Sequence, residues 1–443
     1  MTTPAMSRYF AQRQRGVTLI ELMVAMVLGL LVSAGIITVF LSTSSSNRAQ
    51  TQMARLQEEG RYAVTRLKDD LRMANGQYCT NSGGVAHPSA AQTFMDGLRA
   101  PTVYARNVTA AMADVTTTMG SGSYPAVPTG SYYMPSFLSM RGYDCDKSGC
   151  KPVDPNSAVS AIPKMGKTAG SRVIGADVLT VRYMNSTGGW PIGGSNTITA
   201  KADGTIASIH IVPATGEPAL STLKGKLAML ADCSNAEIFA VSDPNSSGDF
   251  SPASSSSSSD LNLAQPIVQQ PQSAPRLFNF NDDYQTVTYY LQVVDNGNGS
   301  GQTTGALMRR VNGTSSELVR GVERLDFRYG VEGADGKLKY LAADKVDASS
   351  SADCPPSVPT PLGTDPGCLW RAVKSIEINL VMDGQLPLAS LASTDLYYTY
   401  GIDKITTPKA PADHPIKPSD QGFPDGMIRR EFTYLVSVRN YNP

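Results

Sequence analysis

The sequence is poor in charged residues, and those that it has cancel. Of its 443 residues only 17% are Asp, Glu, Lys or Arg, and 38 basic and 38 acidic side chains give a formal net charge of zero. A protein that attracts nucleic acid through its overall field carries an excess of positive charge. We therefore predict that nucleic acid is not a partner.

Motifs that carry catalysis or hold metals are also missing. The sequence has no G-x-S-x-G elbow, no G-x-x-x-x-G-K-[ST] loop, no G-x-G-x-x-G between a strand and a helix, and no H-E-x-x-H. It has no C-x-x-C, and its three histidines, His87, His210 and His414, are scattered. The acidic clusters at 144–146 and 281–283 do not follow the spacing of a calcium loop. We expect no enzyme, no metal and no cofactor, and we interpret the histidines as surface or loop residues.

What the sequence does have is one long apolar segment near its N-terminus. Between Val17 and Leu41 the only charged side chain is Glu21. A helix that rises about 1.5 Å per residue needs roughly 20 apolar residues to cross a bilayer. We predict that residues 17–41 span a membrane. Three arginines and no acidic residue precede this segment, so the chain after Leu41 should lie on the side away from the cytoplasm.

Glu21 is unusual in such a helix, because a carboxylate in hydrocarbon costs about 3 kcal/mol unless a cation meets it. Cleavage after Gly16 would create an α-amino group on Val17, four residues before Glu21. That amine, on the same subunit or on a neighbour packed at a different height, is the natural partner of the acid. Thr18 and Glu21 also match a capping box, in which the two residues satisfy free N–H groups at a helix start.

Two other N-terminal signals compete with this interpretation. A secretory signal peptide has an apolar region of about 7 to 15 residues and ends at a small-residue cleavage site. The run here is longer, although Ser33-Ala34-Gly35 offers such a site. An uncleaved signal anchor would retain the apolar segment in the membrane, but it gives no role to the glycine that ends the basic leader.

The N-terminal pattern resembles the type IV prepilin signal, which is a short basic leader that ends in glycine before an apolar helix with glutamate as its fifth mature residue. Members of that family usually begin the mature chain with phenylalanine, where this sequence has Val17. The resemblance implies that a prepilin peptidase removes the leader 1–16 by cleaving between Gly16 and Val17. It also implies that Val17 is N-methylated and that Glu21 guides the subunit into a helical filament.

Helical periodicity continues beyond the apolar run. Apolar residues recur on one face between charged ones, at Met53, Leu56, Ala63, Val64, Leu67, Leu71 and Ala74. We predict one helix over 17–75 whose first half lies in the membrane and whose second half packs on a globular body. Gly29, Gly35 and Gly60 are weak points in this helix, and they indicate either close packing or local melting in a filament.

The rest of the chain, 76–443, is predicted to form an extracytoplasmic head rich in strands. Alternating patterns predict strands at 178–183, 207–212, 286–294, 307–311, 374–382 and 429–440, and a hairpin over 227–241. Residues 317–330 could hold a short helix or turn before a strand, and 78–168 are loop-like. The segment 245–275 is rich in Ser, Gln and Pro, which predicts a flexible loop. The fold class is α+β and type IV pilin-like, with the long helix packed on a largely antiparallel sheet.

Six cysteines lie beyond the apolar run, on the side predicted to be oxidising, and an even number there suggests disulfides. Cys145 with Cys150 and Cys354 with Cys368 would close short loops rich in Asp, Gly and Pro. That would leave Cys79 for Cys233.

Sequence blocks spread over most of the chain resemble the PilW group of minor pilins. They are residues 54–63, 69–74, 232–234, 322–330, 429–432 and 438–440. The loop-rich region 80–168, the serine tract and the insert between Cys354 and Cys368 depart from that group. The resemblance implies a low-abundance subunit that helps to initiate type IV pilus assembly, belongs to the tip complex, and supports adhesion and twitching motility.

The same resemblance implies the partners and the location. The partners are other minor pilins, the major pilin, a large tip-associated adhesin, the inner-membrane assembly platform and the prepilin peptidase. The chain would cross the inner membrane once with a periplasmic C-terminus and then join the pilus at the cell surface. A J-type minor pseudopilin of type II secretion has the same architecture, and a membrane-anchored extracytoplasmic binding protein or enzyme is the alternative from another class.

Overall fold

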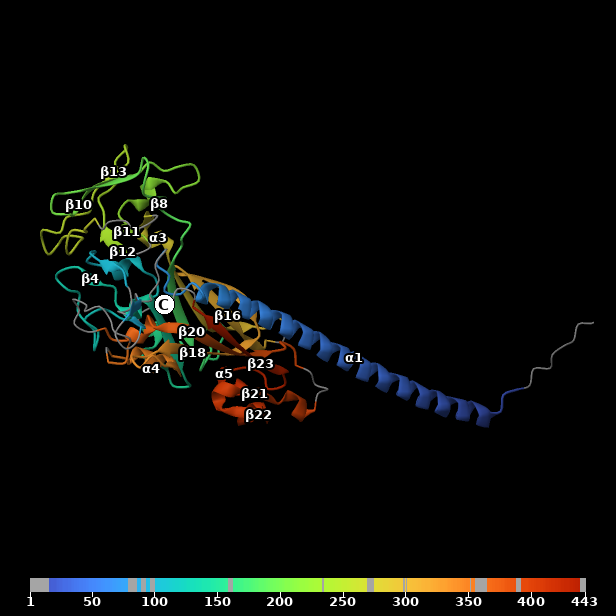
Figure 1. The fold of residues 1–443 in the computed structure, drawn as a ribbon. Coiled ribbons are helices and arrows are strands. Elements are labelled where there is room, and N and C mark those ends of the chain that lie inside the picture. The colour runs from blue at the N-terminus through green and yellow to red at the C-terminus, as the bar shows by residue number, and fades with distance from the viewer. Residues whose placement is uncertain are drawn as a thin grey trace, which may run out of the picture. The chain divides into compact units, whose positions relative to one another are not determined.

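The structure is a computed structural model that describes residues 16–78, 86–88, 93–95, 100–157, 162–232, 235–268, 275–297, 299, 301–350, 352–354, 365–387 and 392–438. The chain divides into two compact units, Met1–Gln52 and Met53–Pro443. Helix α1 (Leu19–Leu71) contributes its first part to one unit and its last part to the other (Figure 1).

The first unit contains the apolar part of α1. Its side chains are exposed from Val17 to Leu41. Among the described residues α1 is the one helix long and apolar enough to cross a membrane, with a mean hydropathy of 2.6 in its most apolar 18-residue window. No proline interrupts it, and leucine, methionine and alanine favour the helix. It begins two residues later and ends four residues earlier than the predicted span 17–75.

The second unit contains three larger sheets. An entirely antiparallel sheet has the order β17 (Thr314–Arg320), β16 (Thr303–Val311), β15 (Tyr284–Asp295), β7 (Val178–Met184), β5 (Met140–Cys145) and β6 (Cys150–Lys151). A second antiparallel sheet has the order β19 (Leu338–Leu341), β18 (Val322–Glu332), β20 (Val373–Asp383) and β23 (Arg429–Ser437). The third sheet has the order β4 (Tyr132–Tyr133), β3 (Thr102–Val103), β12 (Ala236–Ala240), β11 (Leu227–Ala231), β14 (Arg276–Asn279) and β8 (Trp190–Pro191), with one parallel pair, β3 and β12.

Smaller elements complete this unit. The minor sheets are β13 (Asp249–Phe250) with β10 (Ile206–His210) and β9 (Thr197–Ala200), β21 (Tyr398–Tyr400) with β22 (Ile405–Lys409), and β1 (Ala86–Pro88) with β2 (Thr93–Met95). The short α-helices are α2 (Ser136–Ser139), α3 (Phe280–Asp283), α4 (Ala343–Asp347) and α5 (Pro418–Gln421). The 3₁₀ helices are η1 (Val108–Ala111), η2 (Pro155–Ser157), η3 (Leu220–Leu223), η4 (Cys368–Trp370), η5 (Ser393–Leu396), η6 (Gly401–Asp403) and η7 (Pro411–Asp413).

The predicted α+β fold with a long helix and largely antiparallel strands is confirmed. The hairpin predicted over 227–241 is present as β11 and β12. The strand predicted within 317–330 is present as β18, but the short helix or turn predicted before it is wrong, because β17 occupies 317–320 and meets β18 at Gly321, whose φ is 81°. The segment 245–268 contains β13 and the fully buried Asn262, so it is packed on the head more closely than its composition suggests.

The last part of α1, from Met53 to Leu71, packs its apolar face into the main core of the second unit. Leu56, Ala63, Val64, Leu67 and Leu71 are all buried there. Burying a leucine or valine side chain stabilises the folded state by about 2 kcal/mol. Burial of this face therefore stabilises the packing of the helix on the sheet. At Gly60 the helix lies close to β23, because an added Cβ at this residue would lie 2.7 Å from Cζ of Phe432.

One acidic residue on the same part of α1 makes polar contacts with three adjacent strands. Asp70 accepts hydrogen bonds from Arg309 Nε on β16 at 2.7 Å and from its Nη2 at 3.0 Å. The hydroxyls of Tyr289 on β15, at 2.5 Å, and Tyr183 on β7, at 2.9 Å, also donate to it. Burial alone would raise the pKa of Asp70, but these hydrogen bonds and the charge of Arg309 outweigh it, so the pKa is lowered.

We expect Asp70→Asn to lower the free energy of unfolding by about 2 kcal/mol at neutral pH, because Arg309 loses its charged partner in a half-buried site. The ionised Asp70 stabilises the fold above the ordinary carboxyl pKa of 3.8, and this stabilisation is lost as the pH falls through the lowered pKa. The difference between the native chain and the variant should therefore shrink in acid.

Urea unfolding of the detergent-solubilised full chain, at neutral pH and at about pH 3, measures both effects. Glu317→Gln is the matched control, because its pair with Arg320 is exposed and should contribute about 0.5 kcal/mol. A loss for Asp70→Asn that is the same at both pH values would contradict the assigned role of its charge.

Gly60→Ala should destabilise the head by about 1 kcal/mol, because the new methyl group overlaps the ring of Phe432. In a Phe432→Ala background the same substitution should instead stabilise by about 0.8 kcal/mol, the ordinary advantage of alanine over glycine in a helix. Unfolding of the four chains of this double-mutant cycle measures the sign change. An equal effect of Gly60→Ala in both backgrounds would rule out the contact as the reason for the glycine.

Candidate functional site

The N-terminal end of α1 carries the candidate assembly residues. Thr18 precedes the helix, and its backbone N–H and its hydroxyl both donate to Glu21 Oε2 at 2.9 Å. In return Glu21 N–H donates to Thr18 Oγ1 at 3.3 Å. This is the predicted capping box, in which two residues satisfy free N–H groups at the helix start. Because a carboxylate has about four lone-pair sites, Glu21 keeps the capacity to accept a cation as well.

The predicted cleavage site lies directly before this cap. Gly16 and Val17 lie outside α1, and 72% of Val17 is exposed. An exposed peptide bond outside a helix is sterically accessible to a peptidase. The cleavage between Gly16 and Val17 and the methylation of Val17 stay predictions.

The three glycines of α1 have different surroundings. A Cβ on Gly29 or Gly35 would meet no heavy atom of the described chain within 4 Å, whereas one on Gly60 would meet Phe432. Close packing therefore explains Gly60. The described chain offers no steric reason for Gly29 and Gly35, so packing in a filament and local melting both stay open for them.

Two of the predicted disulfides are confirmed. Cys145–Cys150 joins the ends of β5 and β6, and Cys354–Cys368 closes its local loop. The predicted pair Cys79–Cys233 lies outside the described residues. His414 lies in a loop, as predicted, but it is buried, with its ring stacked on Tyr398 at a centroid distance of 3.9 Å. His87 and His210 lie in strands, β1 and β10.

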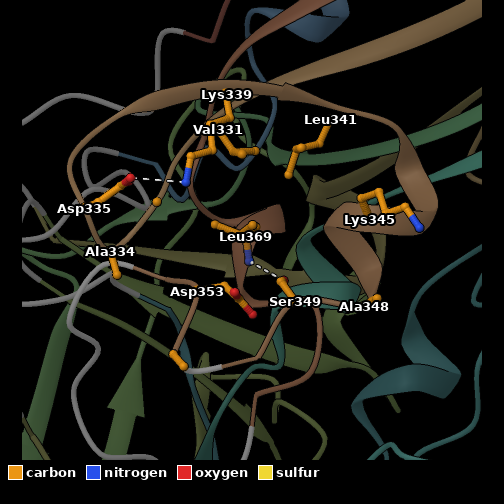
Figure 2. Close-up of a pocket in the computed structure, with 12 residues that line it drawn as sticks. Val331, Ala334, Asp335, Lys339, Leu341, Lys345, Ala348, Ser349, Asp353 and Leu369 are labelled. Carbon is orange, nitrogen blue, oxygen red and sulfur yellow. Dashed lines mark hydrogen bonds and ion pairs between the residues drawn. The ribbon is translucent and has the colours of Figure 1, made fainter.

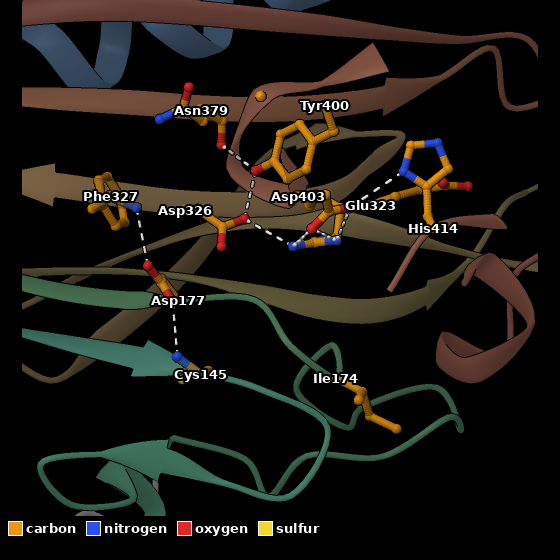
Figure 3. Close-up of polar contacts among 12 residues, drawn as sticks. Cys145, Ile174, Asp177, Glu323, Asp326, Phe327, Asn379, Tyr400, Asp403 and His414 are labelled. Carbon is orange, nitrogen blue, oxygen red and sulfur yellow. Dashed lines mark hydrogen bonds and ion pairs between the residues drawn. The ribbon is translucent and has the colours of Figure 1, made fainter. Parts of the chain in front are cut away.

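A buried polar network surrounds His414 (Figure 3). Its Nδ1 lies 3.2 Å from Asp403 Oδ2, and Arg324 Nη1 on β18 lies 3.3 Å from the same oxygen. The Tyr400 hydroxyl donates to Asp326 at 2.5 Å and to the Asn379 carbonyl at 3.2 Å. These contacts hold the segment from β21 to His414 against β18 and β20.

Asp177 connects this sheet to β5. It accepts hydrogen bonds from the backbone N–H groups of Cys145 at 2.8 Å and Phe327 at 3.0 Å (Figure 3). Burial, and then the nearby charge of Asp326, raise the pKa of Asp177. The network satisfies buried backbone groups, and its geometry fits a structural role.

Two of the blocks that resemble PilW meet through a buried ion pair. Arg429 Nε on β23 lies 2.6 Å from Glu323 Oε2 on β18, and its Nη2 lies 2.9 Å from Oε1. Both side chains are almost completely buried. The sequence analysis did not identify Glu323, Arg324, Asp326 or Arg429 as paired residues. The available signal was the presence of charged residues among the apolar and aromatic residues of these two blocks.

A cavity of about 450 Å³ opens beside α4 (Figure 2). Its polar side chains are engaged locally: Lys339 Nζ lies 3.2 Å from Asp335 Oδ2, and Ser349 Oγ accepts the N–H of Leu369 at 3.2 Å. The lining residues offer no nucleophile held by a base. Within the described ranges, no group of three His, Cys, Asp or Glu side chains is placed to hold a metal ion.

Comparison with known families gives two matches. Residues 288–440 match the family described as Type IV Pilus-assembly protein W, and residues 11–37 match the Prokaryotic N-terminal methylation motif. Neither a curated protein nor a solved structure matches the chain. The first match takes in every strand from β16 to β23, and the second takes in Gly16, Val17 and Glu21. Pilin families point to a structural, non-enzymatic protein. The prepilin motif at one end and the PilW region at the other make the chain similar to PilW-type minor pilins of type IV pili.

Proposed function

We propose that the chain is a PilW-type minor pilin that helps to initiate type IV pilus assembly as part of the tip complex, and that the pilus then supports adhesion and twitching motility. The observation that carries the proposal is the pairing of a prepilin N-terminus with a PilW-type head in one chain. The PilW match favours a pilus over the alternative of a J-type pseudopilin of type II secretion.

The assembly step follows from the charge of Glu21. Before assembly the apolar part of α1 lies in the inner membrane, where an unpaired carboxylate costs about 3 kcal/mol. The prepilin peptidase cleaves after Gly16, and the methylated amine of Val17 on a neighbouring subunit then pairs with Glu21. In the packed core of a filament such a pair is screened little by water, so a subunit at the correct height is favoured over one that is misplaced.

The proposed partners act at successive stages. A prepilin peptidase and the inner-membrane assembly platform meet the chain in the membrane, where it spans once with the head in the periplasm. Other minor pilins and the major pilin contact α1 in the filament. A large tip-associated adhesin contacts the head at the pilus tip on the cell surface.

Glu21→Gln should strongly reduce piliation and twitching, because the isosteric amide keeps the cap but removes the charge that pairs with the amine. Counting surface pili in a deletion strain that carries the variant measures the effect. The matched control is Glu58→Gln, an exposed position on the same helix, which should leave piliation unchanged. Pili at the native level with Gln at position 21 would favour a membrane-anchored binding protein or enzyme over a filament subunit.

Mass spectrometry of the protein from sheared pili should give an N-terminal peptide that begins at N-methylated Val17. Gly16→Ala should block cleavage, so that the membrane fraction keeps the leader 1–16. A mature filament whose subunit still starts at Met1 would contradict the proposed processing.

A further inference from the structure

A second cavity, of about 690 Å³, lies between the loop 116–124 and α4. Ala348, directly after α4, borders both this cavity and the one in Figure 2. The lining of the 690 Å³ cavity is rich in hydroxyl groups, which come from Thr116, Thr117, Thr118, Ser121, Ser123 and Tyr124. Its volume lies in the range of about 300 to 1,000 Å³ that small-molecule sites occupy.

A buried ion pair lines this cavity. Arg141 Nε lies 3.0 Å from Asp347 Oδ1, and the two side chains are only 3% and 4% exposed. Tyr124 donates its hydroxyl hydrogen to Asp347 Oδ2 at 2.5 Å, and Trp370 Nε1 donates to Oδ1 at 3.1 Å. Arg141 also donates to the Thr117 hydroxyl. These groups are held in place before any ligand arrives, which reduces the entropy that binding would cost.

The charges of the lining cancel. Arg141 and Lys151 are balanced by Asp344 and Asp347, while Pro152 and Val153 supply apolar surface. A phosphate or carboxylate would meet two carboxylates, and a cation would meet two basic groups. The ligand that fits is therefore neutral, with many groups that can both donate and accept hydrogen bonds, and with an apolar face.

A pyranose ring has these properties, because each hydroxyl is a donor and an acceptor and the ring C–H groups form an apolar face. An extended peptide is recognised most simply by addition to an exposed sheet edge. The lining here comes mainly from the loop 116–124, Pro152, Val153 and α4. Of the lining residues only Lys151 lies on an edge strand, β6, and this strand has two residues, which is too short to pair with an extended peptide. We propose that this cavity binds a neutral monosaccharide unit, such as the terminal residue of a glycan.

This inference does not rest on the assembly role. Sugar binding is measured on purified protein without pili, whereas loss of piliation leaves the cavity unchanged. The two proposals can therefore fail separately.

The test is ligand-observed saturation-transfer NMR on the full chain, solubilised in a detergent without a sugar headgroup. The probes are methyl β-galactopyranoside, methyl α-mannopyranoside, methyl α-fucopyranoside and methyl N-acetyl-β-glucosaminide, with inorganic phosphate as the charged competitor. We expect at least one sugar to receive saturation from the native chain, and phosphate not to displace it.

Two substitutions fill the cavity from two different segments of its lining, Ser123→Trp and Val153→Trp, and each should weaken sugar binding by about tenfold or more. Thr129→Trp is the matched control, because Thr129 is exposed in the same stretch of chain but does not line the cavity; it should bind as the native chain does. If one blocking variant does not fold, as judged by circular dichroism, the other still tests the site. The proposal is overturned if no sugar binds, if phosphate displaces the sugar, or if a folded blocking variant binds as tightly as the control.

Discussion

One helix has to be stable in two different surroundings, and the rest of the structure depends on this constraint. From Leu19 to Leu41 the side chains of α1 are mostly apolar and exposed, which suits lipid or other helices. From Leu56 to Leu71 the same helix carries a one-sided apolar face that enters the core of the head. The only charge in the first part, Glu21, is held at the very start of the helix, where a capping box already uses one of its oxygens.

The head stabilises itself with a small number of buried ion pairs, although the chain as a whole is poor in charge. Asp70 with Arg309, Glu323 with Arg429 and Arg141 with Asp347 each join elements that are far apart in the sequence. Removing one partner of a buried pair leaves the other charge without compensation. Such pairs therefore help to fix which elements of the head lie near one another, and two of the blocks that resemble PilW meet in this way.

Periodicity predicted the helix and most of the long strands, because these elements bury one face or one stripe of side chains. It failed for the first part of 317–330, where charged and apolar residues mix and where β17 pairs with β16. The signal around Gly16, Val17 and Glu21 could be found because it is local. The ion pairs and the hydroxyl-lined cavity could not, since residues such as Tyr124 and Asp347 are brought together from distant parts of the chain by the fold.

The position of Asp70 has a mechanical consequence. Its carboxylate lies in the last turn of α1 and takes hydrogen bonds from Arg309, Tyr289 and Tyr183, which belong to three neighbouring strands. Tension carried along α1 enters the sheet through all three strands at once. The force on any single strand is correspondingly smaller, so the three strands resist the tension together.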